Sequence, residues 1–244
     1  MHTIAHQKKE RLDRLLANLG YGNRKDVQRL IRRGDVKING EIIKDISLKV
    51  LHGDVLVNDE PLDPIELTIV INKPAGYVCS HDSNEGKTIY SLLPQRWQCR
   101  TPKLSTIGRL DKDTTGVIIL TTDGKLNHTL SSPKSLITKI YEVTLASSLS
   151  GDEIEAFGSG SMILHGEEKP CLPAKMYIMD NYHAVVEIVE GRYHQVKRMF
   201  GAVGNKVVAL HRSRFGDYTC DGLGNGEYIR INVPLECPVS IGDN

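Results

Sequence analysis

The strongest constraint on the fold is an uninterrupted apolar run, VIIL at residues 117–120, directly after a densely charged turn. A short apolar run without polar alternation is typical of a buried strand. The turn before it, GRLDKDTTG, places Arg109, Asp111, Lys112 and Asp113 close together. A turn needs glycine and a short polar residue, but it does not need two cations and two carboxylates. We therefore treat it as a candidate site whose side chains are aimed by a rigid strand.

Other interpretations of this turn are weaker. DKDTTG has the spacing of acids and glycine seen in calcium loops, but a threonine stands where the bidentate glutamate belongs, which excludes calcium. Magnesium at Asp111 and Asp113 stays open, although no GxxxxGK[ST] loop for phosphate occurs. No GxSxG elbow indicates a hydrolase, and nothing in the sequence pairs His128, His194 or His211 with a nucleophile.

The N-terminal part predicts two helices followed by a small hairpin. Leucines recur at helical spacing in RLDRLLANLG, and Asn23 is placed to cap a second helix that ends at Gly34. VKINGEII alternates around an Asn-Gly turn, as hairpins do, and a short strand in DVLVND follows. Residues 9–57 resemble the S4 RNA-binding domain, a family in which a basic helix face lies on RNA phosphates.

The net charge of +1 hides an uneven distribution. Residues 8–33 hold nine Lys and Arg against three acids, whereas residues 34–66 hold three against eight. A second basic stretch, residues 187–214, holds six against two. Such patches are the electrostatic footprint of a polyanion. We expect these cations to bind RNA: Arg11, Arg14, Arg24, Lys25, Arg29, Arg32, Arg33, Arg192 and Arg198.

A linker with prolines at residues 61–66 predicts a boundary between an N-terminal domain, 1–60, and a catalytic domain, 67–244. Residues 81–103 are predicted to be a long polar excursion. The rest of the second domain is mainly strands, with short helices in KLNHTLSS and YHQVKRMFGAVG and no strand–helix–strand rhythm. The chain is therefore predicted to be α+β, with a small αα-β domain followed by a mostly antiparallel mixed sheet.

The signature GRLDKDTTGVIILTTDG resembles that of the pseudouridine synthases. Further stretches resemble the branch that modifies small-subunit ribosomal RNA, in the same order: NKPAGYVCS, SSPKSLITKIYEVTL, EGRYHQVKRMFGAVGNKVVALHR and GEYIRI. By this resemblance Asp111 is the catalytic carboxylate, Tyr141 stacks on the target uracil, and Lys197 pairs with the carboxylate. Leu210 packs in the pocket, and Arg109 fills the gap that the extruded base leaves.

The resemblance implies isomerisation of one uridine to pseudouridine in ribosomal RNA, most closely small-subunit (16S) RNA or its assembly intermediate. The reaction needs no cofactor, because it exchanges an N–C bond for a C–C bond without redox or phosphoryl transfer. Two alternatives stay open: a uridine of large-subunit RNA as the target, and a non-catalytic RNA-binding assembly factor. Asp111, Tyr141 and Lys197 together argue against the second alternative, since binding alone needs none of them.

The expected cellular context follows from what the sequence lacks. No apolar run reaches the length of a membrane span, and the N-terminal residues do not resemble a signal peptide. The five cysteines are scattered, without a CxxC pair, which is typical of reduced thiols in a cytoplasm. We expect a cytoplasmic monomer.

Overall fold

The computed structural model describes residues 9–231, which form two compact units. The first unit comprises the chain up to Leu67 together with residues 90–105 and 121–123, and the second comprises the other described stretches. Two segments beyond the linker thus group with the first unit, and the linear boundaries expected from the sequence stay predictions. Within the described residues, no helix is both long enough and apolar enough to cross a membrane.

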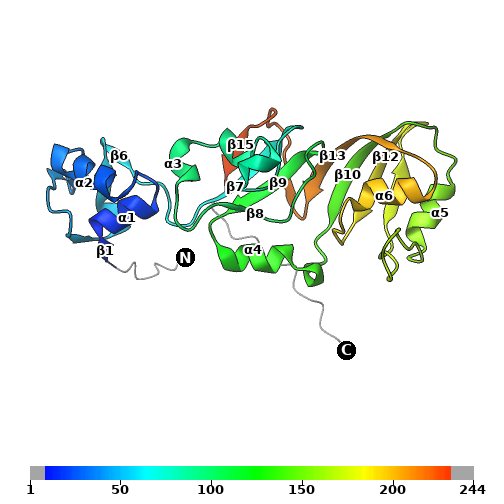
Figure 1. Cartoon of the computed structure of the whole chain (residues 1–244), viewed down its shortest axis with the longest axis horizontal. Coiled ribbons are helices and arrows are strands. Elements are labelled where there is room, and N and C mark those ends of the chain that lie inside the picture. The colour runs from blue at the N-terminus through cyan, green and yellow to red at the C-terminus, as the bar shows by residue number, and fades with distance from the viewer. Residues whose placement is uncertain (1–8, 232–244) are drawn as a thin grey trace. The chain divides into compact units, whose positions relative to one another are not determined.

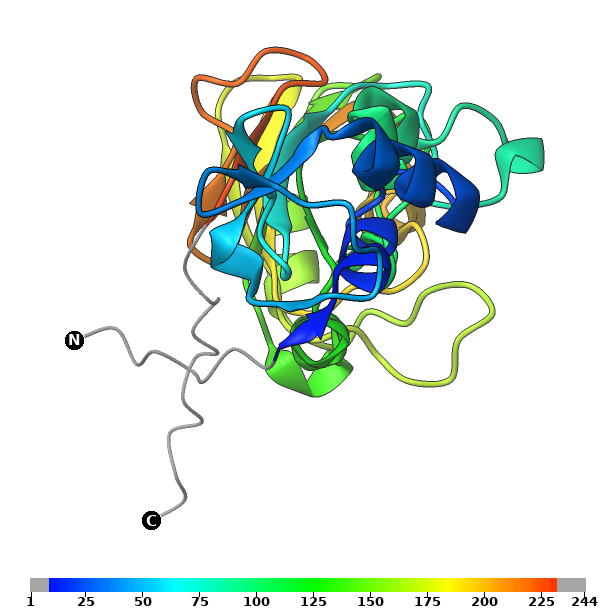
Figure 2. The same ribbon diagram turned by 90° about the vertical axis from the view of Figure 1, so that its left-hand side faces the viewer.

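The first unit contains the two predicted helices and a short later helix beside small sheets (Figures 1 and 2). β1 pairs antiparallel with β4, and a four-stranded sheet has the order β3-β2-β5-β6. The predicted helices and hairpin are confirmed. The elements are β1 (Glu10–Arg11), α1 (Leu12–Asn18), α2 (Arg24–Arg33), β2 (Val36–Ile38), β3 (Glu41–Ile42), β4 (Lys49–Val50), β5 (Val55–Val57), β6 (Glu60–Pro61) and, later in the chain, α3 (Gln95–Gln98).

Local sequence signals explain helix α2 and the hairpin. The Asn23 side chain accepts hydrogen bonds from the backbone N–H groups of Lys25 and Asp26, and the Asp26 carboxylate accepts one from Asn23 N–H. This reciprocal cap satisfies donors that the first helical turn leaves free. Between β2 and β3, Asn39 and Gly40 both have positive φ, 50° and 84°, as the tight hairpin turn requires.

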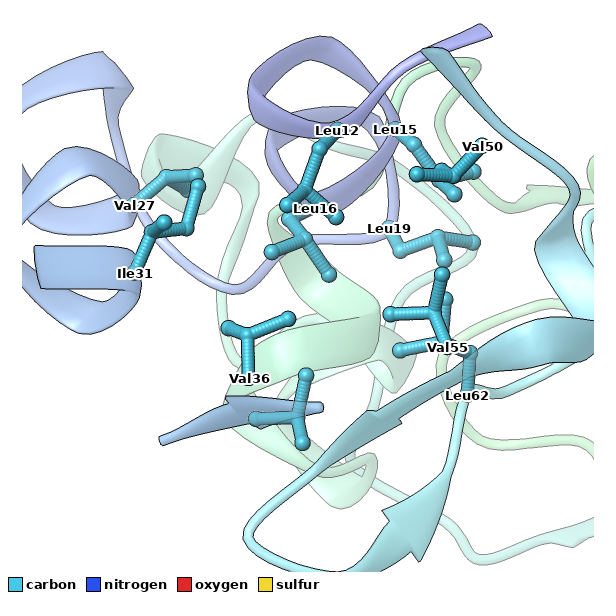
Figure 3. Close-up of a cluster of buried hydrophobic side chains, with 11 residues drawn as sticks. Leu12, Leu15, Leu16, Leu19, Val27, Ile31, Val36, Val50, Val55 and Leu62 are labelled. Carbon is cyan, nitrogen blue, oxygen red and sulfur yellow. The ribbon is translucent and has the colours of Figure 1, made fainter. Parts of the chain in front are cut away.

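The core of the first unit is aliphatic. Leucines of α1 point toward Val27 and Ile31 of α2 and toward the strands, as Figure 3 shows. The buried set is Leu12, Leu15, Leu16, Leu19, Val27, Ile31, Val36, Val50, Val55, Val57 and Leu62. Because α2 buries this stripe, its charged residues are left on the exposed side.

The expectation of a polar excursion is wrong for much of residues 81–103. Tyr90, Leu93 and Trp97 are buried, and Trp97 lies on the short helix α3. The indole N–H of Trp97 and the guanidinium of Arg96 both donate to the Asp63 carboxylate, each at 2.9 Å. This stretch therefore anchors the linker within the first unit.

The second unit is built on one large, mostly antiparallel sheet, as predicted, with the order β11-β12-β10-β13-β9-β7-β15. β14 pairs with β13 and β8 with β9, and β13 with β9 is a parallel pair. The elements are β7 (Thr68–Lys73), β8 (Ser105–Thr106), β9 (Thr115–Thr121), α4 (Gly124–Ser131), β10 (Lys139–Leu145), α5 (Asp152–Gly158), β11 (Lys175–Ile178), β12 (His183–Ile188), α6 (Gln195–Ala202), β13 (Val207–Phe215), β14 (Tyr218–Thr219) and β15 (Tyr228–Arg230).

Strand β9 has the buried character that its sequence predicts. Val117, Ile118, Ile119 and Leu120 are all at most 1% exposed. The strand begins beside Gly116, where a Cβ atom would lie 2.2 Å from the backbone oxygen of the neighbouring β13. Only glycine fits this contact, which explains the last residue of the GRLDKDTTG turn.

Helix α6 packs against β13 and carries one half of the site described below. It buries Val196, Met199 and Phe200 as its apolar face. The ring of Phe200 meets the ring of Phe157 from α5 edge-on, with centroids 4.9 Å apart. This packing fixes the rotation of α6 and hence the direction of its polar residues.

Candidate active site

The turn that carries Asp111 is held from beneath by a buried lysine. Lys73 is 0% exposed, and its ammonium donates to the carbonyl oxygens of Thr114 at 2.8 Å, Pro74 at 3.1 Å and Lys112 at 3.3 Å. Burial lowers the pKa of Lys73, and the nearby Cys79, Asp113 and Asp111 oppose this effect. The ammonium therefore fixes the carbonyl groups of the turn, so that the turn's own side chains are free to face outward.

Asp111 has a cation or donor on each carboxylate oxygen. Its Oδ2 lies 2.9 Å from Nζ of Lys197, and its Oδ1 lies 3.3 Å from Nε2 of His194. The same Lys197 ammonium also contacts Oδ1 of Asp113 at 2.6 Å. The Asp111 side chain is 26% exposed and that of Asp113 is 76% exposed. Asp111 is thus the more enclosed of the two carboxylates.

The charges of this cluster support one another. Burial alone would lower the pKa of Lys197, but hydrogen bonds to Asp113 and Asp111 outweigh it, and the pKa is raised. The hydrogen bond from Lys197 likewise lowers the pKa of Asp113. The ammonium therefore stays charged at neutral pH, next to the carboxylate that the sequence singles out.

His194 is a neighbour of Asp111 that the sequence did not pair with it. It stands just before α6 with φ of 48°, in the left-handed region that non-glycine residues rarely occupy. Its ring stacks on that of Tyr193, with centroids 3.8 Å apart. This conformation turns the imidazole toward Asp111. No local pattern signals it, because the partner lies in a distant turn.

Asp111 opens on a cavity of about 330 Å³ whose wall includes Tyr141, Leu210 and Arg109. Tyr141 lies on β10, is 9% exposed and faces the cavity from the middle of the sheet; Leu210, on the adjacent β13, is 7% exposed. Arg109 is exposed at the rim. An adjoining hollow of about 420 Å³ shares the turn and His194. The structure thus brings together all five residues that the resemblance selects, and their roles stay predictions.

The inner wall of the same cavity carries two cations that the sequence did not single out, Lys139 and Arg212. Arg212 is 3% exposed and sits directly opposite Tyr141 in the pairing of β10 with β13. Burial, and secondarily the charge of Arg212, lowers the pKa of Lys139 to about 8. The sheet register could not be read from the sequence, and the register is what makes these residues neighbours.

Two arginines expected to bind RNA are engaged inside the second unit. Arg192 donates to the carboxylates of Glu167 at 2.7 Å and Glu190 at 3.1 Å, and also to the carbonyl oxygens of Lys169 and Pro170. Arg198 donates to Glu167 at 2.6 Å and to two further carbonyl oxygens. Both guanidinium groups thus hold the loop that precedes β11, and their RNA-binding role stays a prediction.

The predicted cations of the first unit are more exposed. Arg24, Lys25, Arg29, Arg32 and Arg33 of α2 are all solvent-exposed. Three of the predicted cations form ion pairs with acids nearby in the sequence: Arg29 with Asp26 at 3.6 Å, Arg33 with Asp35, and Arg14 with Glu10 at 3.2 Å. Arg11 grips the buried Asp13 with two hydrogen bonds of 3.0 and 2.9 Å. The face of α2 therefore offers a surface of positive charge.

The part of the chain that the structure describes contains no cluster of metal ligands. Within residues 9–231, no three His, Cys, Asp or Glu side chains gather as metal ligands would. The two carboxylates of the turn share one lysine ammonium, which occupies the position that a cation would take.

Comparison with known proteins points in one direction. The family model described as RNA pseudouridylate synthase matches residues 67–202, and the S4 domain model matches residues 10–62. A protein of Haemophilus influenzae named ribosomal small subunit pseudouridine synthase A is 44% identical over 226 residues, which cover 89% of this chain and 94% of that protein. Its namesake in Escherichia coli K12 is 41% identical, with the same coverage of both chains. A crystal structure titled pseudouridylate synthase is 41% identical, with a TM-score of 0.63 and coverage of 91% of this chain and 95% of that one.

Proposed function

This chain belongs to the RNA pseudouridylate synthase family and carries an S4 domain, and from that premise we propose that it isomerises one uridine of small-subunit ribosomal RNA. The net reaction breaks the N1–C1′ bond, forms a C5–C1′ bond, removes a proton from C5 and adds one to N1. Atoms and electrons balance without an oxidant, a reductant or a phosphoryl donor. The curated relatives from two bacteria, which carry the small-subunit name, support the choice of substrate.

The observation that carries the proposal is the enclosed carboxylate of Asp111. It is bonded to Lys197 and faces a cavity walled by Tyr141 and Leu210. A uridine within folded RNA must leave its stack before its C1′ can reach a protein group, and this extrusion costs a few kcal/mol. The cavity offers the apolar and aromatic surface that an extruded base needs in return.

Each residue has a role in this proposal. Asp111 is the catalytic carboxylate, and it acts by attack on C1′, by attack on C6, or by starting a proton-loss route. Lys197 keeps a positive charge beside the carboxylate as water is displaced. Tyr141 stacks on the uracil and Leu210 packs against it. Arg109, exposed at the rim, fills the space that the base vacates.

The first unit supplies RNA affinity in this proposal. Phosphate contacts fix position and register, whereas the cavity selects the base. The exposed cations of α2 are suited to phosphates because they are solvated and carry one sign of charge. Because the RNA-binding face and the cavity belong to one chain, we propose that the protein modifies its RNA as a monomer. We place this reaction in the cytoplasm, where ribosomal RNA is made.

The test is the substitution Asp111→Asn, which keeps the size of the side chain and removes its charge. Small-subunit ribosomal RNA tritiated at C5 of uridine releases tritium with the wild-type protein, and the variant should release none while binding the RNA about equally well. Sequencing of pseudouridines in ribosomal RNA from cells without the protein identifies the site. Conversion by Asp111→Asn at the wild-type rate would refute the catalytic role. If the missing pseudouridine were found only in large-subunit RNA, the substrate would be large-subunit RNA instead.

A further inference from the structure

The inner wall of the cavity holds an arginine with hydrogen-bond donors left over. Arg212 is 3% exposed, and its Nε donates to the carbonyl oxygen of Val117 at 2.9 Å. Its Nη2 is buried and has no acceptor among residues 9–231. A guanidinium carries five N–H donors, and buried donors in native proteins are almost always satisfied. An unmatched guanidinium on the wall of a cavity indicates that a ligand brings the acceptor.

A second cation strengthens this indication. The ammonium of Lys139 lies 5.7 Å from the ring centre of Phe215, and the guanidinium carbon of Arg212 lies 5.0 Å from it. Both residues line the cavity, and their proximity contributes to the lowered pKa of Lys139, which burial mainly causes. Two positive charges in a semi-enclosed space repel each other unless electron-rich atoms lie between or beside them.

The acids that line the cavity are already engaged. Glu190 accepts hydrogen bonds from Gln195 at 2.5 Å and Arg192 at 3.1 Å. Asp111 is bonded to Lys197, as described above. The inner wall therefore has an excess of donors and positive charge, and the occupant it fits is an acceptor that carries or develops negative charge.

The difference in burial between Asp111 and Arg212, at opposite ends of the cavity, indicates how the occupant is oriented. Asp111 lies nearer to solvent, with 26% of its side chain exposed, whereas Arg212 is almost completely buried. A base whose C1′ reaches Asp111 directs the opposite end of its ring, the C4 carbonyl, inward. We propose that Arg212 donates hydrogen bonds to the C4 carbonyl oxygen of the extruded uracil, with Lys139 beside it, and thereby selects uracil. This proposal rests on the proposed function and names how that site recognises its base.

The same donors also suit the reaction. When the N1–C1′ bond breaks, its electron pair stays on the base and spreads over both carbonyl oxygens, where a buried guanidinium stabilises it. The base then turns about the axis through N3 and C6, which exchanges N1 with C5 and the C4 carbonyl with the C2 carbonyl. Arg212 therefore meets a carbonyl oxygen before and after the turn. The C5–C1′ bond then forms, the C5 proton leaves to water, and N1 takes a proton from water.

Selection against cytosine follows from the same contact. Cytosine presents an amino group at C4, so two sets of N–H donors would face each other in a buried site. A site that leaves its polar group unpaired with the wrong ligand discriminates more strongly than one that relies on shape. Uracil presents an oxygen at C4 and therefore accepts the hydrogen bonds that Arg212 offers.

The experiment pairs a change in the protein with a change in the base. The probe is a small-subunit ribosomal RNA fragment that the wild-type protein converts, made with uridine or with 4-deoxyuridine at the converted position. Binding is measured on Asp111→Asn protein, so that no turnover occurs. We expect the uridine RNA to bind roughly tenfold to a hundredfold more tightly than the 4-deoxyuridine RNA. The added substitution Arg212→Met should abolish this preference.

The control is Arg214→Met, which removes an exposed arginine from the same strand and should leave the preference intact. An unchanged preference in the Arg212→Met protein would overturn the proposal, as would equal binding of the two RNAs by protein that retains Arg212. The second comparison needs no substitution at Arg212 and stands even if Arg212→Met fails to fold. Absence of conversion by the wild-type protein would instead refute the proposed function.

Discussion

The cations of α2 and those around α6 are the same kinds of residue in opposite surroundings. On α2, the side chains of Arg29 and Arg33 are 76% and 68% exposed. Around α6, those of Arg192, Lys197 and Arg198 are 20–25% exposed, and each has short contacts with carboxylates. Sequence composition gives both stretches the same positive character, and only the structure separates them.

The difference indicates two uses of positive charge. A solvated cation attracts RNA phosphates at long range, is screened by salt, and is replaceable by another cation nearby. A partly buried cation with a defined acceptor fixes one geometry, and its removal leaves a charge without a partner. We therefore expect substitutions on α2 to act gradually and in proportion to charge, and substitutions near α6 to act individually.

Among the cations of these two regions, the largest effect should come from Lys197. Lys197→Met leaves Asp111 and Asp113 facing each other without the ammonium that joins them, and loss of one such electrostatic contact typically costs on the order of a hundredfold in rate. Single-turnover tritium release measures the rate, while filter binding should show little change in RNA affinity. Lys197→Arg should recover much of the rate, since it restores the charge.

Asp113→Asn is the matched control for that comparison. It removes the exposed partner of the same lysine and keeps the enclosed one, so we expect a change of less than about threefold, as for exposed ion pairs. An equal loss in both variants would show that the cluster works as a whole and that the enclosed carboxylate has no special place.

An intermediate effect is expected on α2. Replacing Arg24, Lys25 and Arg32 together by Gln should weaken RNA binding and reduce the slope of log affinity against log salt by about 2, since each phosphate contact contributes about 0.7–0.9. The folded structure should persist, because these side chains are exposed. Titrations between low and moderate salt give the slope.

Arg198→Gln tests the same comparison with a cation of α6. Its guanidinium bonds Glu167 and two carbonyl oxygens, so its loss should lower the melting temperature and leave the salt slope almost unchanged. A slope that falls by as much as for one α2 cation would show that Arg198 also contacts phosphates, and the division between the two regions would fail.

The same contrast explains what the sequence could predict. The limits of α2 and its cap follow from neighbouring residues, because Asn23, Asp26 and Gly34 act within one or two turns. Strand β9 follows from composition alone. The stretch around Trp97 was missed because the acceptor that anchors Trp97, the carboxylate of Asp63, lies 34 residues earlier in the chain, where no local pattern connects the two.

The site needed more than local pattern. Asp111 and Lys197 are 86 residues apart, and only the resemblance to a family joined them before the structure did. His194 reaches Asp111 through a left-handed backbone conformation that histidine rarely adopts, so no pattern announces it. Arg212 faces the cavity because of a strand register, which depends on side chains of three strands at once.

An effect on stability alone concerns Lys139, and it distinguishes a buried cation from an exposed one by pH. Its pKa in the folded protein is lowered from an ordinary value of 10.5 to about 8 by burial and by Arg212. Between these values the unfolded chain holds a proton that the folded protein does not, so stability rises with pH in this window, and below pH 8 the contribution is flat.

Urea unfolding at several pH values should show the stability of the wild-type protein rising relative to that of Lys139→Met between pH 8 and 10, by at most about tenfold in the folding equilibrium constant per pH unit. Lys25→Met on α2 removes the same charge from a solvated position and corrects for net charge. The rise in wild-type stability with pH could be equally large relative to Lys139→Met and to Lys25→Met. The pKa of the cavity lysine would then not differ from that of a lysine on the surface of α2, and this electrostatic contrast between the two regions would be refuted.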